Sequence, residues 1–193
     1  AALGIDTGRS CTLTVSVEGS GYEEDFNEMK IPAALYKVAD VDVSGRYTAV
    51  GAFEEMDFSG LNSETDAAAW MTFAEEAAGY LEGADAVQKK EVAKEEGSSA
   101  AAGAVFDNLA TGLYLVVPEA AYNPDYTVRY LFTPYLTALP SSEYALTGAG
   151  SDEWNYETVI GLKAEGEPQY GRLNITKVLS NYNETLGRTS FVF

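Results

Sequence analysis

The sequence contains no histidine and only one cysteine. Without histidine the chain lacks the side chain that most often acts as a general base near neutral pH and as a metal ligand. A single cysteine excludes both an intrachain disulfide and a cluster of cysteine thiolates around a metal. Cys11 lies on the apolar side of the alternating segment 10–17, so we expect an inert thiol in the core. The composition predicts neither a metal nor a cofactor.

Basic residues are also scarce, because twelve lysines and arginines stand against thirty acidic residues and give a formal net charge of −18. This charge repels nucleic-acid phosphates and anionic lipid headgroups, so we expect no nucleic-acid partner and no membrane binding. No apolar run approaches the about 20 residues that cross a bilayer, and we expect no signal peptide among these residues. If the protein is exported, we expect this chain to be a processed form.

Strand-forming segments dominate what is present. The apolar content of 46% is enough for a core. Short segments rich in tyrosine, valine and threonine alternate with Gly, Pro, Asn or Asp, which is typical of strands joined by turns. The sequence therefore predicts a mainly β fold, an immunoglobulin-like β-sandwich. The expected strands are 12–17, 31–38, 46–53, 112–117, 126–136 and 156–162.

One helix is expected to interrupt the strands, over residues 64–81. Ser63 is the expected N-cap, with Asp66 three residues later where a capping box places an acid. Apolar residues recur there at helical spacing and are expected to pack on a sheet: Trp70, Phe73, Ala74, Ala77 and Leu81. The polar residues 82–103 that follow indicate a solvated helix end and a flexible loop.

The C-terminal residues indicate a second domain. Residues 166–171 are polar and interrupted by Gly and Pro, as in a linker between domains. Strand-like residues follow it, but two strands alone cannot bury an apolar face. We therefore expect a first domain over 1–165, a linker over 166–171, and the first strands of a second β-sandwich domain over 172–193.

Two groups of acidic residues are candidate sites. Residues 40–45 begin like a calcium-binding loop, but position twelve, where an EF-hand requires glutamate, is Gly51. A turn between two strands explains the same residues. Paired carboxylates could support glycoside hydrolysis, but acids are so frequent here that pairs arise by chance. We therefore expect no enzyme, although a deep cleft with two converging carboxylates would revive that hypothesis.

Four segments resemble, in order, the N-terminal domain of major pilins that sortases assemble in Gram-positive bacteria. They are 30–40 (KIPAALYKVAD), 106–116 (FDNLATGLYLV), 132–140 (FTPYLTALP) and 154–163 (WNYETVIGLK). The last resembles the pilin motif, in which a tryptophan precedes an alternating strand that ends in lysine. Residues 171–193 resemble the first strands of a collagen-adhesin B-type (Cna_B) domain.

The resemblance implies a secreted subunit at the cell surface or cell wall whose partners are other pilin subunits and a sortase. Lys163 is then the intermolecular acceptor of an isopeptide bond, and Trp154 supports the motif. The chain departs from the motif at Thr158 and Ile160, which replace valines, and at 161–162, where Gly-Leu replaces Tyr-Pro.

The family also forms isopeptide bonds within a domain. By resemblance, Lys177 is the bond-forming lysine of the second domain, with partners beyond residue 193. In the first domain the acid position holds Pro118, with Glu119 one residue away and so on the other face of the strand. We expect no such bond there. The alternative function is a surface adhesin or minor pilin whose tyrosines contact glycans or host matrix proteins.

Overall fold

The computed structural model describes residues 4–61, 65–142 and 154–169. The described residues divide into two compact units, which are described separately: the first lies within residues 4–120 and 132–164, and the second comprises 121–131 and 165–169. Strands far outnumber helices in the described residues, so the expectation of a mainly β fold is confirmed.

The first unit contains a three-stranded sheet in the order β12 (Glu157–Gly161), β1 (Cys11–Ser16), β5 (Gly103–Leu109). β1 runs parallel to β12 and antiparallel to β5. Alternate residues of β1 are fully buried, because successive strand residues point to opposite faces. This alternation is the pattern that predicted the strand.

A larger sheet in the same unit follows the order β3 (Tyr47–Ala49), β2 (Ile31–Val41), β6 (Gly112–Pro118), β9 (Tyr135–Leu139), with β4 (Gln88–Val92) paired to the first half of β2. β6 is buried on both faces. Leu113 and Leu115 join an apolar cluster that includes helix residues Ala74 and Ala77. The residue between them, Tyr114, points to the other face, which Cys11 of β1 approaches.

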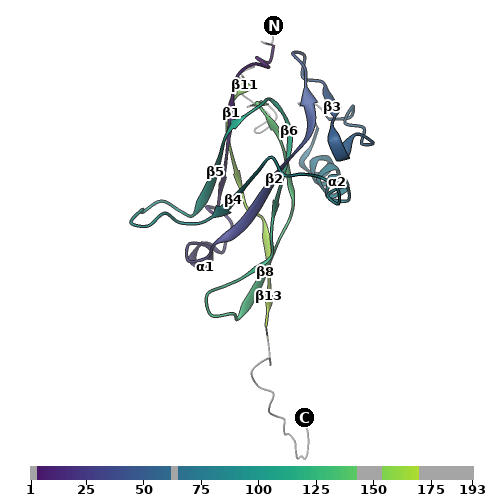
Figure 1. Ribbon diagram of the computed structural model, residues 1–193. Coiled ribbons are helices and arrows are strands. Elements are labelled where there is room, and N and C mark those ends of the chain that lie inside the picture. The colour runs from purple at the N-terminus through teal and green to yellow at the C-terminus, as the bar shows by residue number, and fades with distance from the viewer. Residues whose placement is uncertain (1–3, 62–64, 143–153, 170–193) are drawn as a thin grey trace, which may run out of the picture. The chain divides into compact units, whose positions relative to one another are not determined.

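Helix α2 (Ala67–Ala78) covers one face of the larger sheet, contacting β6 and β9. Figure 1 shows it on the side of β2 and β6 away from β1 and β5. The packing predicted for the apolar stripe is confirmed. The helix is shorter than expected, because Asp66 is its N-cap and accepts a hydrogen bond from the Ala69 N–H at 2.9 Å. The expected cap, Ser63, lies outside the described residues.

Several expected boundaries were wrong. Residues 82–103 contain strand β4, and β5 begins at Gly103, where a helix end and loop were expected. Residues 51–53 form a short 3-10 helix (η1) in place of the end of the strand expected over 46–53. The expected strand 126–136 is divided into β8 (Val128–Phe132) and β9 around Pro134, which lacks a backbone N–H for a ladder. A short helix, α1 (Glu23–Phe26), was not expected.

A short ladder of β10 (Ser141–Ser142) and β11 (Trp154–Asn155) completes the first unit. The second unit has the sheet order β13 (Ala164–Pro168), β8, β7 (Ala121–Tyr122). Residues 166–168, expected in the linker, thus lie in a strand, where Glu167 pairs with Arg129 at 3.3 Å. The strands expected in 172–193, and Lys177 with them, lie outside the described residues.

Candidate functional site

Lys163 lies between β12 and β13, and its side chain is exposed. The backbone on both sides of it is fixed. The Leu162 N–H donates to the carbonyl of Ser16 at 3.0 Å, and the Lys163 carbonyl accepts from the Thr133 N–H at 3.1 Å. The Leu162 side chain is only 6% exposed. A solvent-facing amine is therefore presented from a backbone held in the sheet.

The amine of Lys163 is not held by a charged or polar side chain among the described residues. The ion pairs of the described residues are Lys37–Asp40, Arg46–Asp42 and Arg129–Glu167, and none of them includes Lys163. No side-chain hydrogen bond from its amine was found within the described part of the chain either. An exposed amine without an internal partner can approach an external acyl donor without first breaking a native contact.

The strand leading to Lys163 accommodates the departures from the pilin motif. In the parallel register, Leu13 of β1 faces Thr158, and Val15 faces Ile160. Thr158 is buried, but its hydroxyl lies 2.9 Å from the hydroxyl of Ser141, so the polar group is satisfied. Gly161 is exposed, and a side chain there would meet the Glu18 carbonyl only at an ordinary 3.7 Å. Leu162 then returns the chain to the core.

Trp154 lies at the other end of this strand segment. One edge of its ring is 4.0 Å from the position that a Cβ would take on Gly45, in the β2–β3 turn. Lys163 follows nine positions later in the sequence, a length over which an extended chain can cover at most roughly 30 Å. The supporting role of Trp154 in the motif therefore stays a prediction.

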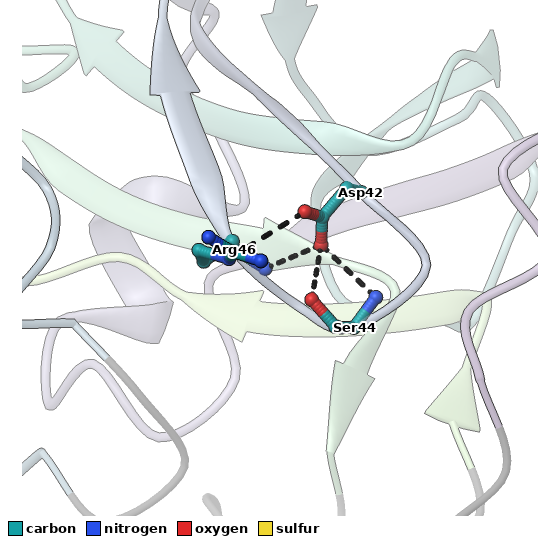
Figure 2. Close-up of polar contacts among 3 residues, drawn as sticks. All are labelled: Asp42, Ser44 and Arg46. Atoms are coloured by element: carbon teal, nitrogen blue, oxygen red, sulfur yellow. Dashed lines mark hydrogen bonds and ion pairs between the residues drawn. The ribbon is translucent and has the colours of Figure 1, made fainter.

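The turn near Trp154 includes residues 40–45, which begin like a calcium-binding loop. Asp42 Oδ1 accepts hydrogen bonds from the Ser44 hydroxyl at 2.7 Å and from the N–H groups of Ser44 and Arg46 at 2.9 Å (Figure 2). Hydrogen bonds from the Ser44 hydroxyl and, to a smaller extent, from the Arg46 N–H keep the pKa of Asp42 below its ordinary value. The turn interpretation is confirmed, and no metal-binding group of side chains was found among the described residues.

Cys11 has the inert setting that the sequence predicted. It is fully buried, and burial raises its pKa to about 11, against a smaller opposing effect of Arg9. By the family resemblance, an internal isopeptide bond would join a lysine on the first strand of the domain to an asparagine on its last strand. β1 contains no lysine and β12 no asparagine. Pro118 is buried at the end of β6, while Glu119 is exposed.

Sequence reasoning missed one feature of the second unit, the exposed pair Tyr122 and Tyr126 on the β7–β8 hairpin. The Asn-Pro-Asp turn between the two tyrosines was the available signal, because such turns place their flanking residues close together.

No protein-family model and no curated protein matches this chain. Among solved structures, it is similar to the full-length major pilin SpaD from Corynebacterium diphtheriae, with 24% identity, a TM-score of 0.45, and coverage of 83% of this chain and 31% of that one. It is also similar to the T6 backbone pilin of Streptococcus pyogenes, with 12% identity, a TM-score of 0.47, and coverage of 85% and 29%. The chain thus spans about a third of the length of each. No helix among the described residues is long and apolar enough to cross a membrane.

Proposed function

We propose that this chain is the N-terminal part of a structural pilus subunit on the surface of a Gram-positive bacterium. A sortase links the subunit to its neighbours through Lys163, and the resulting fibre supports cell adhesion. The observation that carries the proposal is the exposed amine of Lys163 on a backbone held by Ser16 and Thr133. The order of the four pilin-like segments along the sequence supports it.

For this reaction the chain itself needs to supply only the amine of Lys163. The Lys163 amine attacks the carbonyl of a thioester between sortase and another subunit, the carbon–sulfur bond breaks, and an isopeptide bond forms. The proton lost by the amine passes to the departing thiolate. A protonated amine cannot attack a carbonyl, so a base on the sortase must remove a proton before the attack. This chain contributes the position of the amine and acts as substrate rather than enzyme.

The domain organisation belongs to the same proposal. It has a pilin-type domain over residues 1–165, a connection over 166–171 whose first three residues continue strand β13, and a Cna_B-like domain that begins at residue 172. Lys177 would form the internal isopeptide bond of that domain with an asparagine further along a longer chain. Such a bond needs a lysine whose charge is suppressed by burial and a nearby carboxyl group that can transfer protons.

The test incubates the intact precursor with its sortase and compares the wild type with Lys163→Arg on a denaturing gel. Arginine keeps the charge but cannot act as the nucleophile, because its guanidinium stays protonated. We expect high-mass ladders for the wild type and none for Lys163→Arg. Lys94→Arg, at an exposed lysine of the β4–β5 connection, is the matched control and should keep the ladders. Ladders that persist in Lys163→Arg would remove Lys163 from the proposal.

A further inference from the structure

Two exposed tyrosines lie together on the β7–β8 hairpin of the second unit. Tyr122 is 40% exposed and Tyr126 63%, and their ring centroids are 5.5 Å apart with the ring planes inclined by 40°. Within the described residues, neither phenol hydroxyl has a hydrogen-bond partner. Tyrosine offers a large apolar body and a polar tip, and for this reason it is enriched in binding surfaces.

The hairpin that carries the two rings is held by a buried asparagine. Asn123 is 6% exposed. Its Oδ1 accepts from the Val128 N–H at 3.0 Å, and its Nδ2 donates to the Thr127 hydroxyl at 3.0 Å. Its backbone carbonyl accepts from the Tyr126 N–H at 3.0 Å. Because the loop is already ordered in the free protein, binding a ligand there would not cost the conformational entropy of ordering it.

The backbone at Tyr126 indicates that the turn does not require its aromatic side chain. Its φ is +60°, in the left-handed region that glycine and asparagine adopt more readily than bulky residues. The turn's hydrogen bond at this position comes from the backbone N–H, which any residue except proline would supply. A bulky residue held in this conformation beside a second exposed ring is a signal of a functional surface.

The charge at the hairpin favours a cationic partner. Asp125 Oδ1 accepts from the Thr127 hydroxyl at 2.6 Å and from its N–H at 3.2 Å, and these bonds hold the pKa of Asp125 below its ordinary value. The one basic residue in the described part of this unit, Arg129, pairs with Glu167. The ionised Asp125 therefore has no cationic partner there.

We propose that Tyr122, Asp125 and Tyr126 form a binding site for a cationic side chain, arginine or lysine, of a partner polypeptide. The face of a tyrosine ring attracts a cation, and a guanidinium can stack flat on it while donating to a neighbouring carboxylate. The net charge of −18 draws such a partner toward the protein. Because the two rings are inclined, they provide no common plane on which a sugar ring could lie.

The site lies in the second unit and does not depend on the linkage at Lys163. It can be tested by NMR titration of the full chain with a blocked peptide, acetyl-Gly-Arg-Gly-Gly-Arg-Gly-amide. We expect shifts concentrated at Tyr122, Asp125 and Tyr126, and none with the peptide in which citrulline replaces arginine. Tyr126→Asn removes one ring but suits the positive φ, and Asp125→Asn keeps an acceptor for Thr127. Each should weaken binding roughly three- to tenfold.

The control variant is Asp85→Asn, at an exposed acid in the first unit, which changes the net charge as Asp125→Asn does. It should leave the dissociation constant unchanged. Equal weakening by Asp85→Asn and Asp125→Asn would show a general attraction to negative charge and overturn the proposal. Shifts spread over the whole surface would do the same. Tighter binding of chitotriose than of the arginine peptide at these residues would also contradict it, because the site would then be one for a glycan.

Discussion

The hydroxyl groups of Ser141 and Thr158 lie 2.9 Å apart in the interior of the first unit. Thr158 belongs to β12, the strand that leads to Lys163, and Ser141 to the short strand β10. Both side chains are buried, so each hydroxyl depends on the other for the hydrogen bond it loses from water. The pair connects β12, which leads to Lys163, to a neighbouring part of the unit without a covalent bond.

Thr158→Val should destabilise the protein, because it keeps the shape of the side chain but leaves the Ser141 hydroxyl buried without its partner. The expected loss is about 1–3 kcal/mol of the free energy of unfolding, measured in urea. In the double variant Ser141→Ala/Thr158→Val no hydroxyl is left unpaired, and part of the loss should be recovered. Strictly additive single effects would contradict the proposed dependence of one hydroxyl on the other.

Gly112 should not tolerate a side chain. A Cβ there would lie 2.5 Å from the carbonyl oxygen of Ala39 and 2.8 Å from the Lys37 Cε, at the pairing of β6 with β2. Gly112→Ala must therefore shift a central backbone and should lower the free energy of unfolding by about 1–3 kcal/mol or more. Gly161→Ala is the control, because a Cβ there has ordinary contacts. Similar stabilities of the two variants would show that the β6–β2 contact is looser than described.

The Cys11 thiol should be unreactive in the folded protein. With its pKa raised to about 11 by burial, roughly one molecule in a thousand carries a thiolate at pH 8. Reaction with a thiol-specific reagent at this pH should therefore be slow in buffer and fast in concentrated urea. Rapid labelling of the folded chain would place the thiol at the surface and contradict its position on the inner face of β1.

The Asp42 turn should make stability depend on acid pH. Its pKa is depressed in the folded state, so its contribution is present above the ordinary aspartate pKa of about 3.9 and is lost as the pH falls through the folded value. Asp42→Ala should lower the Tm at pH 7, and the difference from wild type should shrink as the pH falls below about 3.9. Asp85→Ala, at an exposed acid outside the turn, is the control and should leave the Tm at pH 7 close to that of wild type. A pH-independent deficit in Asp42→Ala would exclude this linkage.

Much of the first unit could be predicted from the sequence, because its central strands carry their own pattern. β1 alternates apolar and polar residues, and β6 is almost continuously apolar. β4 (QKKEV) was missed, since its pairing depends on the exposed edge of β2 and not on an apolar face of its own. Part of β13 (AEGEP) was expected to be a linker, because this strand also has no apolar face of its own.

The candidate site was predictable only in part. The segment that ends at Lys163 gives the lysine its place after a strand, but its exposure depends on how Ser16 and Thr133 hold the neighbouring backbone. Those two residues lie far away in the sequence, and no local pattern links them to it.

The most direct test of the account is tandem mass spectrometry of digested, sortase-assembled polymer, which identifies the lysine that carries the branch. The other candidate acceptors are Lys30, Lys37, Lys89, Lys90, Lys94 and Lys177. The account predicts a branched peptide joined through the side-chain amine of Lys163, with the remaining lysines unmodified between subunits. A polymer whose subunits are joined through any other lysine, with Lys163 recovered as a free amine, would contradict it.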